Sequence, residues 1–508
     1  MHQRVRYPDT IEPLVQFIEQ TPPAQIIDQA LEKLRAGTEP KTMLTASALA
    51  VVRSADLPPG HHGGPLHPLA GLHAITNLVN RLDGEDKFLP ILQHVALSNK
   101  HINDPVTSPY SLLEFAPLDP SGAQVTRTAD LAADGSGDEA ATTEGIEAAK
   151  EAFLKACSRG EALKADHIFL WLWDHVPAIE AFDLLMSIAL PKNALDDHYF
   201  LFPGYLWRAL ETLGTEHLKV LFRPAVRYVA RFPAQRLVPE ADALIEEHGL
   251  LTRILRQRTG DDETAKIGEL GEAIRAVKTY PDIPKMIAQA LADGLSLEGA
   301  GEALSIGAAG LFLRSLTGNP MDVHLHTSAN LRRYLIRLDG FSMKNKLLTL
   351  LLWHTGPEVK STQYRMEAEL QPDAAAVAAL PHRSQEELLE AITQSIYTQP
   401  PTDWSTVTNL GMMRAVPEVK QTVNLAQQYV NLRYDPQVLI NRLAQIVCHD
   451  NFTEMHAFKH HQAVIEEFHN TREPWRWMHL VCGCQAAAIS FGKNMSVYED
   501  ALELMHAA

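Results

Sequence analysis

A short segment near the C-terminus carries three side chains that could hold a metal ion together. His456, Lys459 and His460 are spaced by three and four residues, so in an α-helix they project from one face. Helices in metal-binding bundles present their ligands with this spacing. A solvated polar face is the alternative, but Phe458 and Phe468 indicate that the helix also has an apolar side. We therefore predict that His456, Lys459 and His460 belong to a buried metal site.

Histidines also cluster near the N-terminus, between Gly60 and Pro68, in a segment that contains His62 and His67. Glycines in this segment let the backbone approach a ligand closely, and imidazole is a common ligand of transition metals. A flexible histidine loop is the alternative. Because the segment leads directly into an apolar helical pattern, we expect it to be anchored in the core. We predict that His62, His67 or both are metal ligands.

A third motif places two histidines close to a helix start at Pro320. His324 and His326 are two residues apart, so they point about 200° away from each other on a helix with 3.6 residues per turn. At most one of them should reach a given site. We predict that His324 is the ligand.

A further candidate is His175, which lies in the most apolar stretch of the chain. Trp171, Trp173 and Phe182 surround it in sequence, so we expect it to be buried. A buried histidine can be satisfied by a backbone carbonyl alone, and that alternative stays open. We include His175 among the predicted metal ligands.

The elements that must position these residues are helices. Apolar residues recur every three or four positions along most of the chain, and convincing period-two runs are absent. We predict an all-α fold, a large irregular helical bundle or solenoid-like array with a buried metal site. Residues 1–117 form an N-terminal helical region with the histidine-rich loop, 118–145 an acidic loop or disordered insert, and 146–508 the main helical domain. We expect 1–117 and 146–508 to form one compact fold.

Composition narrows the classes of function. The chain has 508 residues, 23 histidines and a formal net charge of -17, a charge that repels phosphate backbones and disfavours nucleic acid as a partner. Only four cysteines are present, and their scarcity fits a reducing compartment. No apolar stretch has the length and uniformity of a signal peptide or membrane helix. We therefore expect a cytoplasmic protein with no membrane or nucleic-acid partner. Its oligomeric state stays open.

Two of the histidine motifs also resemble those of a known family. His456-Ala457-Phe458-Lys459, and His324 with Thr327 ahead of Ala-Asn-Leu-Arg, are similar to motifs of the questin oxidase-like family. The early histidine cluster before an amphipathic helix resembles that family's first motif. The similarity consists of short motifs scattered over most of the chain.

The resemblance implies an all-helical, non-haem iron oxygenase that acts on quinone-like substrates with dioxygen as co-substrate. It implies that His62 or His67, His324 and His456 are ligands, and that Lys459 is carboxylated on its side-chain nitrogen. A lysine in a dry pocket has a depressed pKa, so its neutral amine can add carbon dioxide. The resulting anion would offset the charge of a metal ringed by neutral imidazoles.

We therefore expect an iron-dependent oxygenase acting on an aromatic or quinone-like small molecule, with Lys459 as the catalytic residue. A zinc or manganese hydrolase in the same site is one alternative. A non-catalytic helical-repeat scaffold with surface histidines is another, because helical periodicity alone does not require any chemistry.

Overall fold

The structure is a computed structural model. It describes residues 3–58, 63–115, 143–192, 198–231, 239–315, 320–355, 372–398, 417–449, 454–492 and 495–506, with Val359, Thr362, Gln363 and Met366 between them. Helices dominate these described parts, which contain no strand beyond an isolated antiparallel bridge between Arg4 and Leu113. The predicted all-α fold is confirmed. No described helix is both long enough and apolar enough to span a bilayer.

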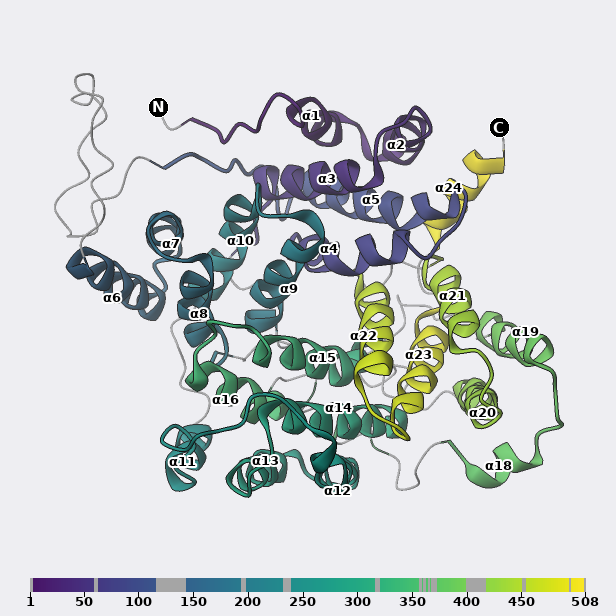
Figure 1. Ribbon diagram of the computed structural model, residues 1–508. Helices are drawn as coiled ribbons and strands as arrows, with labels where there is room; N and C mark the ends of the chain where they lie inside the picture. The colour runs from purple at the N-terminus through teal and green to yellow at the C-terminus, as the bar shows by residue number, and fades with distance from the viewer. Residues whose placement is uncertain are drawn as a thin grey trace.

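The N-terminal region forms one edge of the molecule, at the top of Figure 1. Helices α3 and α5 pack against each other, and the C-terminal helix α24 returns to contact α2 and α5. The helices of this region are α1 (Glu12–Gln20), α2 (Ile26–Arg35), α3 (Pro40–Ser54), α4 (Leu66–Val79) and α5 (Leu89–Asn103).

The next helices run from one side of the molecule toward its centre (Figure 1). Val176 ends α7 in an extended conformation, which is the conformation that a following proline favours, and Pro177 then caps α8. Residues 118–142 of the predicted insert lie outside the described residues, whereas 143–145 already belong to α6. These helices are α6 (Thr143–Arg159), α7 (Ala162–His175), α8 (Ala178–Ala189), α9 (His198–Leu213) and α10 (Leu218–Ala230).

The middle of the chain supplies the most deeply buried helix, α14, all of whose residues are buried. Ser296 caps it by accepting a hydrogen bond from the backbone N–H of Gly299. Gly307 lets α12 pack closely, since a Cβ at that position would lie 2.3 Å from Cγ2 of Ile274. The helices here are α11 (Pro239–Glu247), α12 (Thr264–Arg275), α13 (Ile283–Ala292), α14 (Leu297–Arg314), α15 (His324–Ile336) and α16 (Met343–Leu351).

The C-terminal part returns to the centre, where α22 packs against α4, α15 and α23. Figure 1 shows α22 and α23 lying side by side next to α15. The helices are α18 (Ala374–Ala379), α19 (Gln385–Tyr397), α20 (Pro417–Asn431), α21 (Pro436–Val447), α22 (His456–Asn470), α23 (Arg476–Ser490) and α24 (Ser496–His506).

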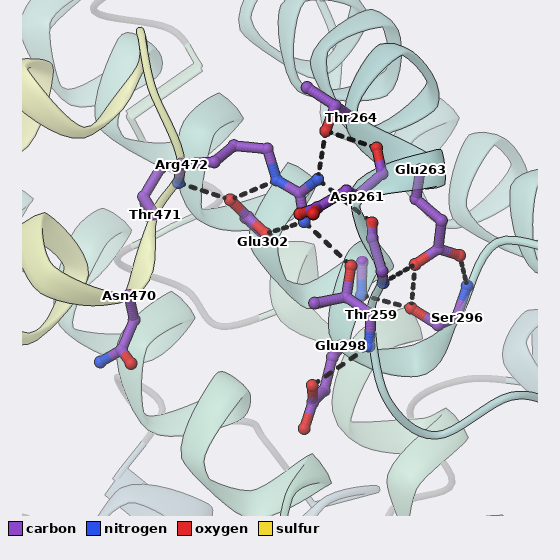
Figure 2. Close-up of polar contacts among 12 residues, drawn as sticks. Thr259, Asp261, Glu263, Thr264, Ser296, Glu298, Glu302, Asn470, Thr471 and Arg472 are labelled. Atoms are coloured by element: carbon purple, nitrogen blue, oxygen red, sulfur yellow. Dashed lines mark hydrogen bonds and ion pairs between the residues drawn. The ribbon is translucent and has the colours of Figure 1, made fainter.

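A polar junction fixes the C-terminal end of α22 against α12 and α14 (Figure 2). Arg472 follows this helix, and its guanidinium donates hydrogen bonds to Glu302, to Oγ1 of Thr264 at 2.6 Å and to Oγ1 of Thr259 at 2.9 Å. Its backbone N–H donates to the same carboxylate at 2.8 Å. When a guanidinium donates several hydrogen bonds to one carboxylate, the contact fixes the relative orientation of the two groups and also stabilises the fold. The junction therefore holds α22 in a fixed direction relative to the core.

Candidate metal centre

Four helices surround one point in the core, because α4 contacts α9, α9 contacts α15, α15 contacts α22, and α22 contacts α4. Each begins with a histidine in its first two residues, although more than a hundred residues separate each histidine from the next. The four side chains are almost completely buried. They are His67 of α4, His198 of α9, His324 of α15 and His456 of α22.

Three of these imidazoles have the geometry of a metal site. Nitrogen atoms of His67, His198 and His456 all lie within 4.8 Å of one another. The fourth ring, that of His324, lies 4.8 Å from the ring of His456 and 5.7 Å from that of His198, measured between centroids. Two nitrogens that bind one cation at the usual bond length of roughly 2 Å lie at most about 4 Å apart. Nitrogens within 4.8 Å of one another therefore need to move together by less than about 1 Å to share an ion.

Lys459 lies one turn further along α22 and is 5% exposed. Its Nζ is 5.8 Å from the ring centroid of Tyr205. Burial and the Lys459 charge hold the pKa of His67 well below its usual range. The imidazole of His67 is therefore neutral near pH 7, which is the form that binds a metal.

The orientation of His67 is defined by a carboxylate. Its Nε2 lies 3.2 Å from Oε2 of Glu454, so the negative charge of that carboxylate favours the neutral tautomer that carries its proton on Nε2. Nδ1 then carries the lone pair, and it is buried without a hydrogen-bond partner among the described residues. A metal ligand whose second ring nitrogen is bonded to a carboxylate is the usual arrangement in metal sites.

The backbone around this pair is also constrained. Glu454 and Met455 have φ angles of 47° and 71°, a left-handed conformation that costs residues other than glycine energy and is concentrated at functional sites. Gly63 has φ of 80°, and a Cβ there would lie 2.4 Å from Nε2 of His67. Only glycine therefore fits at this position beside His67.

A second group of histidines lies on the other faces of α15 and α22. Nδ1 of His326 is 3.1 Å from Nε2 of His460, and its Nε2 is 2.9 Å from Nδ1 of His479. Nε2 of His479 is 3.1 Å from Oγ1 of Thr471, which also accepts a hydrogen bond from Arg333 at 3.0 Å. These rings form a hydrogen-bonded chain, because the two nitrogens of His326 each contact a different histidine. Burial lowers the pKa of His326 to about 4, so this ring is neutral near pH 7.

The structure brings together His67, His324, His456 and Lys459 of the predicted site. It places His460 in the histidine chain instead, so the prediction that His460 shares the site of His456 is wrong. Residues four apart are rotated by about 40° on an α-helix. One turn into α22 that rotation is enough to direct His460 toward His326 of α15 and the ring of Phe312 on α14. The choice of His324 over His326 agrees with the opposite directions of the two rings.

The structure does not bring His175 to the site. It ends α7 as an exposed residue, stacked on Trp171 with ring centroids 4.0 Å apart, and its Nδ1 is 2.7 Å from the Trp171 carbonyl oxygen. The expectation that His175 is buried is wrong, because its aromatic neighbours cover only one side of α7. His62 lies outside the described residues.

His198 is the site residue that the sequence analysis missed. It stands at the start of an apolar helix, as His67 and His456 do, and that shared position is the signal that could have identified it. Comparison with known proteins adds nothing to this picture, since no family model, curated protein or solved structure matches the chain.

Proposed function

We propose that this protein is a metal-dependent oxygenase whose metal, iron in the first instance, is held by His67, His198, His324 and His456. The observation that carries the proposal is the convergence of four buried imidazoles from four distant segments. Burying so many imidazoles is costly unless their nitrogens have partners. Imidazole donors suit iron, zinc, copper or nickel and not magnesium or calcium.

The charge of the site supports a modified Lys459. Four helix N-termini meet there, and each carries a partial positive charge from its unbonded N–H groups. A metal cation and a lysine ammonium would add to that positive potential. Carboxylation replaces the ammonium with an anion: the neutral amine forms an N–C bond with carbon dioxide and releases one proton. The carbamate then offsets part of the positive potential.

Iron in this setting would supply activation of dioxygen for an aromatic or quinone-like substrate. The protein's own residues have separate tasks. His67 is oriented by Glu454, and the buried surroundings of the four imidazoles exclude water, which strengthens every electrostatic interaction in the site.

The four cysteines are all free thiols, which supports a reducing, cytoplasmic location.

A zinc or manganese hydrolase is the second candidate function. Glu454 favours it, because a carboxylate beside a metal ligand could accept a proton from an attacking water. Metal analysis of protein purified without a histidine tag separates the two functions. About one iron per chain, with oxygen consumption in the presence of a quinol or phenol, supports the oxygenase. Zinc or manganese without oxygen consumption supports the hydrolase. The absence of any stoichiometric metal would contradict both.

A further inference from the structure

Helices α2, α5 and α24 lie next to one another (Figure 1). Residues of these three helices line a cavity of about 600 Å³. This volume is in the range of sites that bind small molecules of two or three rings. Apolar side chains from all three helices form part of its wall, and three charged side chains face it. The apolar group includes Ile26, Leu97 and Val497, and the charged group is Lys100, Glu454 and Asp500.

Glu454 connects this cavity with the histidine site. It lines the cavity, its side chain is 35% exposed, and its carboxylate lies 3.2 Å from Nε2 of His67. His67 itself is only 3% exposed. A molecule in the cavity would therefore meet Glu454 before any imidazole, and a hydrogen bond to Glu454 would place it one side chain away from His67.

We propose that this cavity binds the substrate, and that the substrate is a ring-sized molecule that donates hydrogen bonds and carries no negative charge. The proposal rests on the proposed function, because it assigns the cavity to the same metal site. Glu454, the lining residue that contacts His67, accepts a hydrogen bond from a hydroxyl or amino group of the substrate. The apolar walls cover the ring.

The charges of the cavity define this substrate class. Two carboxylates, Glu454 and Asp500, face one ammonium, that of Lys100, so the local balance is negative. The whole chain carries a formal net charge of -17, which also disfavours the approach of an anion. Carboxylates only accept hydrogen bonds, so the two acidic residues select for donors. A carboxylate substituent on the same ring would be repelled by both.

The test compares the binding of two probes, 2-naphthol and 2-naphthoate, to the full-length, metal-loaded protein by calorimetry. Val497→Trp fills the cavity from the half-buried side of α24. Val438→Trp introduces the same side chain at a half-buried position of α21 outside the cavity. We expect saturable binding of 2-naphthol that Val497→Trp weakens at least tenfold and Val438→Trp leaves unchanged. We also expect 2-naphthoate to bind at least tenfold more weakly.

Metal content, measured in all three proteins, separates this inference from the proposed function. Equal metal content with weakened 2-naphthol binding in Val497→Trp supports the cavity as the substrate site. The cavity proposal is overturned if the wild type does not bind 2-naphthol, if Val497→Trp binds it as well as the wild type does, or if 2-naphthoate binds as tightly. A protein without metal that still shows the Val497→Trp effect would contradict the proposed function and leave the cavity as a binding site.

Discussion

His198 gives the sharpest test of the site at the scale of single residues, because it is absent from the ligands predicted from the sequence. Its nitrogen lies within 4.8 Å of nitrogens of His67 and His456, so we expect it to be a ligand. His198→Ala should lower metal affinity by more than the roughly 10–100-fold that loss of an outer partner costs. Competition with a coloured chelator measures this change.

His94 provides the matched control for that substitution. It is equally buried, but its two ring nitrogens are satisfied by Ser47 Oγ at 3.0 Å and the Pro68 carbonyl at 3.1 Å. His94→Gln should destabilise the fold and keep the metal. Equal metal affinity in wild type and His198→Ala would remove His198 from the ligand set.

Lys459 has a testable modification of its own. Protein equilibrated with ¹³C-labelled bicarbonate should show a carbamate carbon signal by NMR, because an anion is needed among four helix N-termini and a cation. The signal should be absent from Lys459→Met. Lys420 on the peripheral helix α20 offers the control, as Lys420→Met should retain the signal. Finding no difference between wild type and Lys459→Met would rule out carboxylation at this position.

Buried histidines outside the proposed ligand set predict how stability depends on pH. Burial lowers the pKa of His94, His101 and His449 to about 4 in each case, from an ordinary value of 6.5. Between these values the unfolded chain binds more protons than the folded chain, so stability is fully present above pH 6.5 and is lost as the pH falls toward 4.

Urea unfolding of the metal-free protein at pH 7, 6 and 5 measures this effect. Between pH 6.5 and 4, each of these histidines lowers the free energy of unfolding by at most about 1.4 kcal/mol for each pH unit. His94→Gln should therefore reduce the slope relative to wild type. An unfolding free energy that is constant from pH 7 to 5 would show that these side chains are already accessible to protons in the folded state.

At the scale of elements, the pairing of α15 with α22 positions the site. Each helix contributes one histidine to the metal centre and one to the histidine chain: His324 and His326 from α15, and His456 and His460 from α22. The hydrogen bond between His326 and His460 at 3.1 Å joins the two helices close to the proposed ligands. The histidine chain therefore maintains the alignment of His324 with His456.

His326→Leu tests this role. The substitution removes the imidazole to which His460 and His479 are bonded, which should lower the free energy of unfolding by about 1–3 kcal/mol. It should also weaken metal binding, although His326 is not a ligand. Gln485→Leu is the control, because it removes a buried hydrogen bond to the Phe312 carbonyl and should destabilise without changing metal affinity. If His326→Leu binds metal as tightly as the wild type does, the histidine chain has no role in positioning the ligands.

Element type and several boundaries could be predicted from the sequence, since they depend on local patterns. The break at Pro177 and the opposite directions of His324 and His326 follow from backbone chemistry and the helical repeat. The prediction that His460 shares the site of His456 failed because it depends on tertiary packing, which local patterns do not describe. Spacing establishes which residues share a face, but the neighbour that each turn of the face meets depends on how other helices cross it.

At the scale of the whole molecule, the metal site is formed by the tertiary fold. Its four histidines come from α4, α9, α15 and α22, and no local sequence pattern indicates that the N-termini of these four helices meet. The sequence could therefore predict His67, His324 and His456 individually as candidates, but it could not predict which histidines converge. His198 was missed and His175 was included for the same reason: burial and proximity are properties of packing.

Specific backbone and side-chain features position both ends of α22. Left-handed backbone at Glu454 and Met455 begins the helix beside His67, and the Arg472 junction of Figure 2 follows its last turn. A site formed by four separate segments needs such fixed supports, because small displacements of ligands lower metal affinity.

The most direct test is anomalous diffraction from crystals of the untagged protein, recorded on both sides of the iron absorption edge. The account predicts one strong anomalous peak in each chain, surrounded by nitrogens of His67, His198, His324 and His456, with Lys459 beside it. A peak elsewhere in the molecule, or none in crystals grown from iron-supplemented cells, would contradict it.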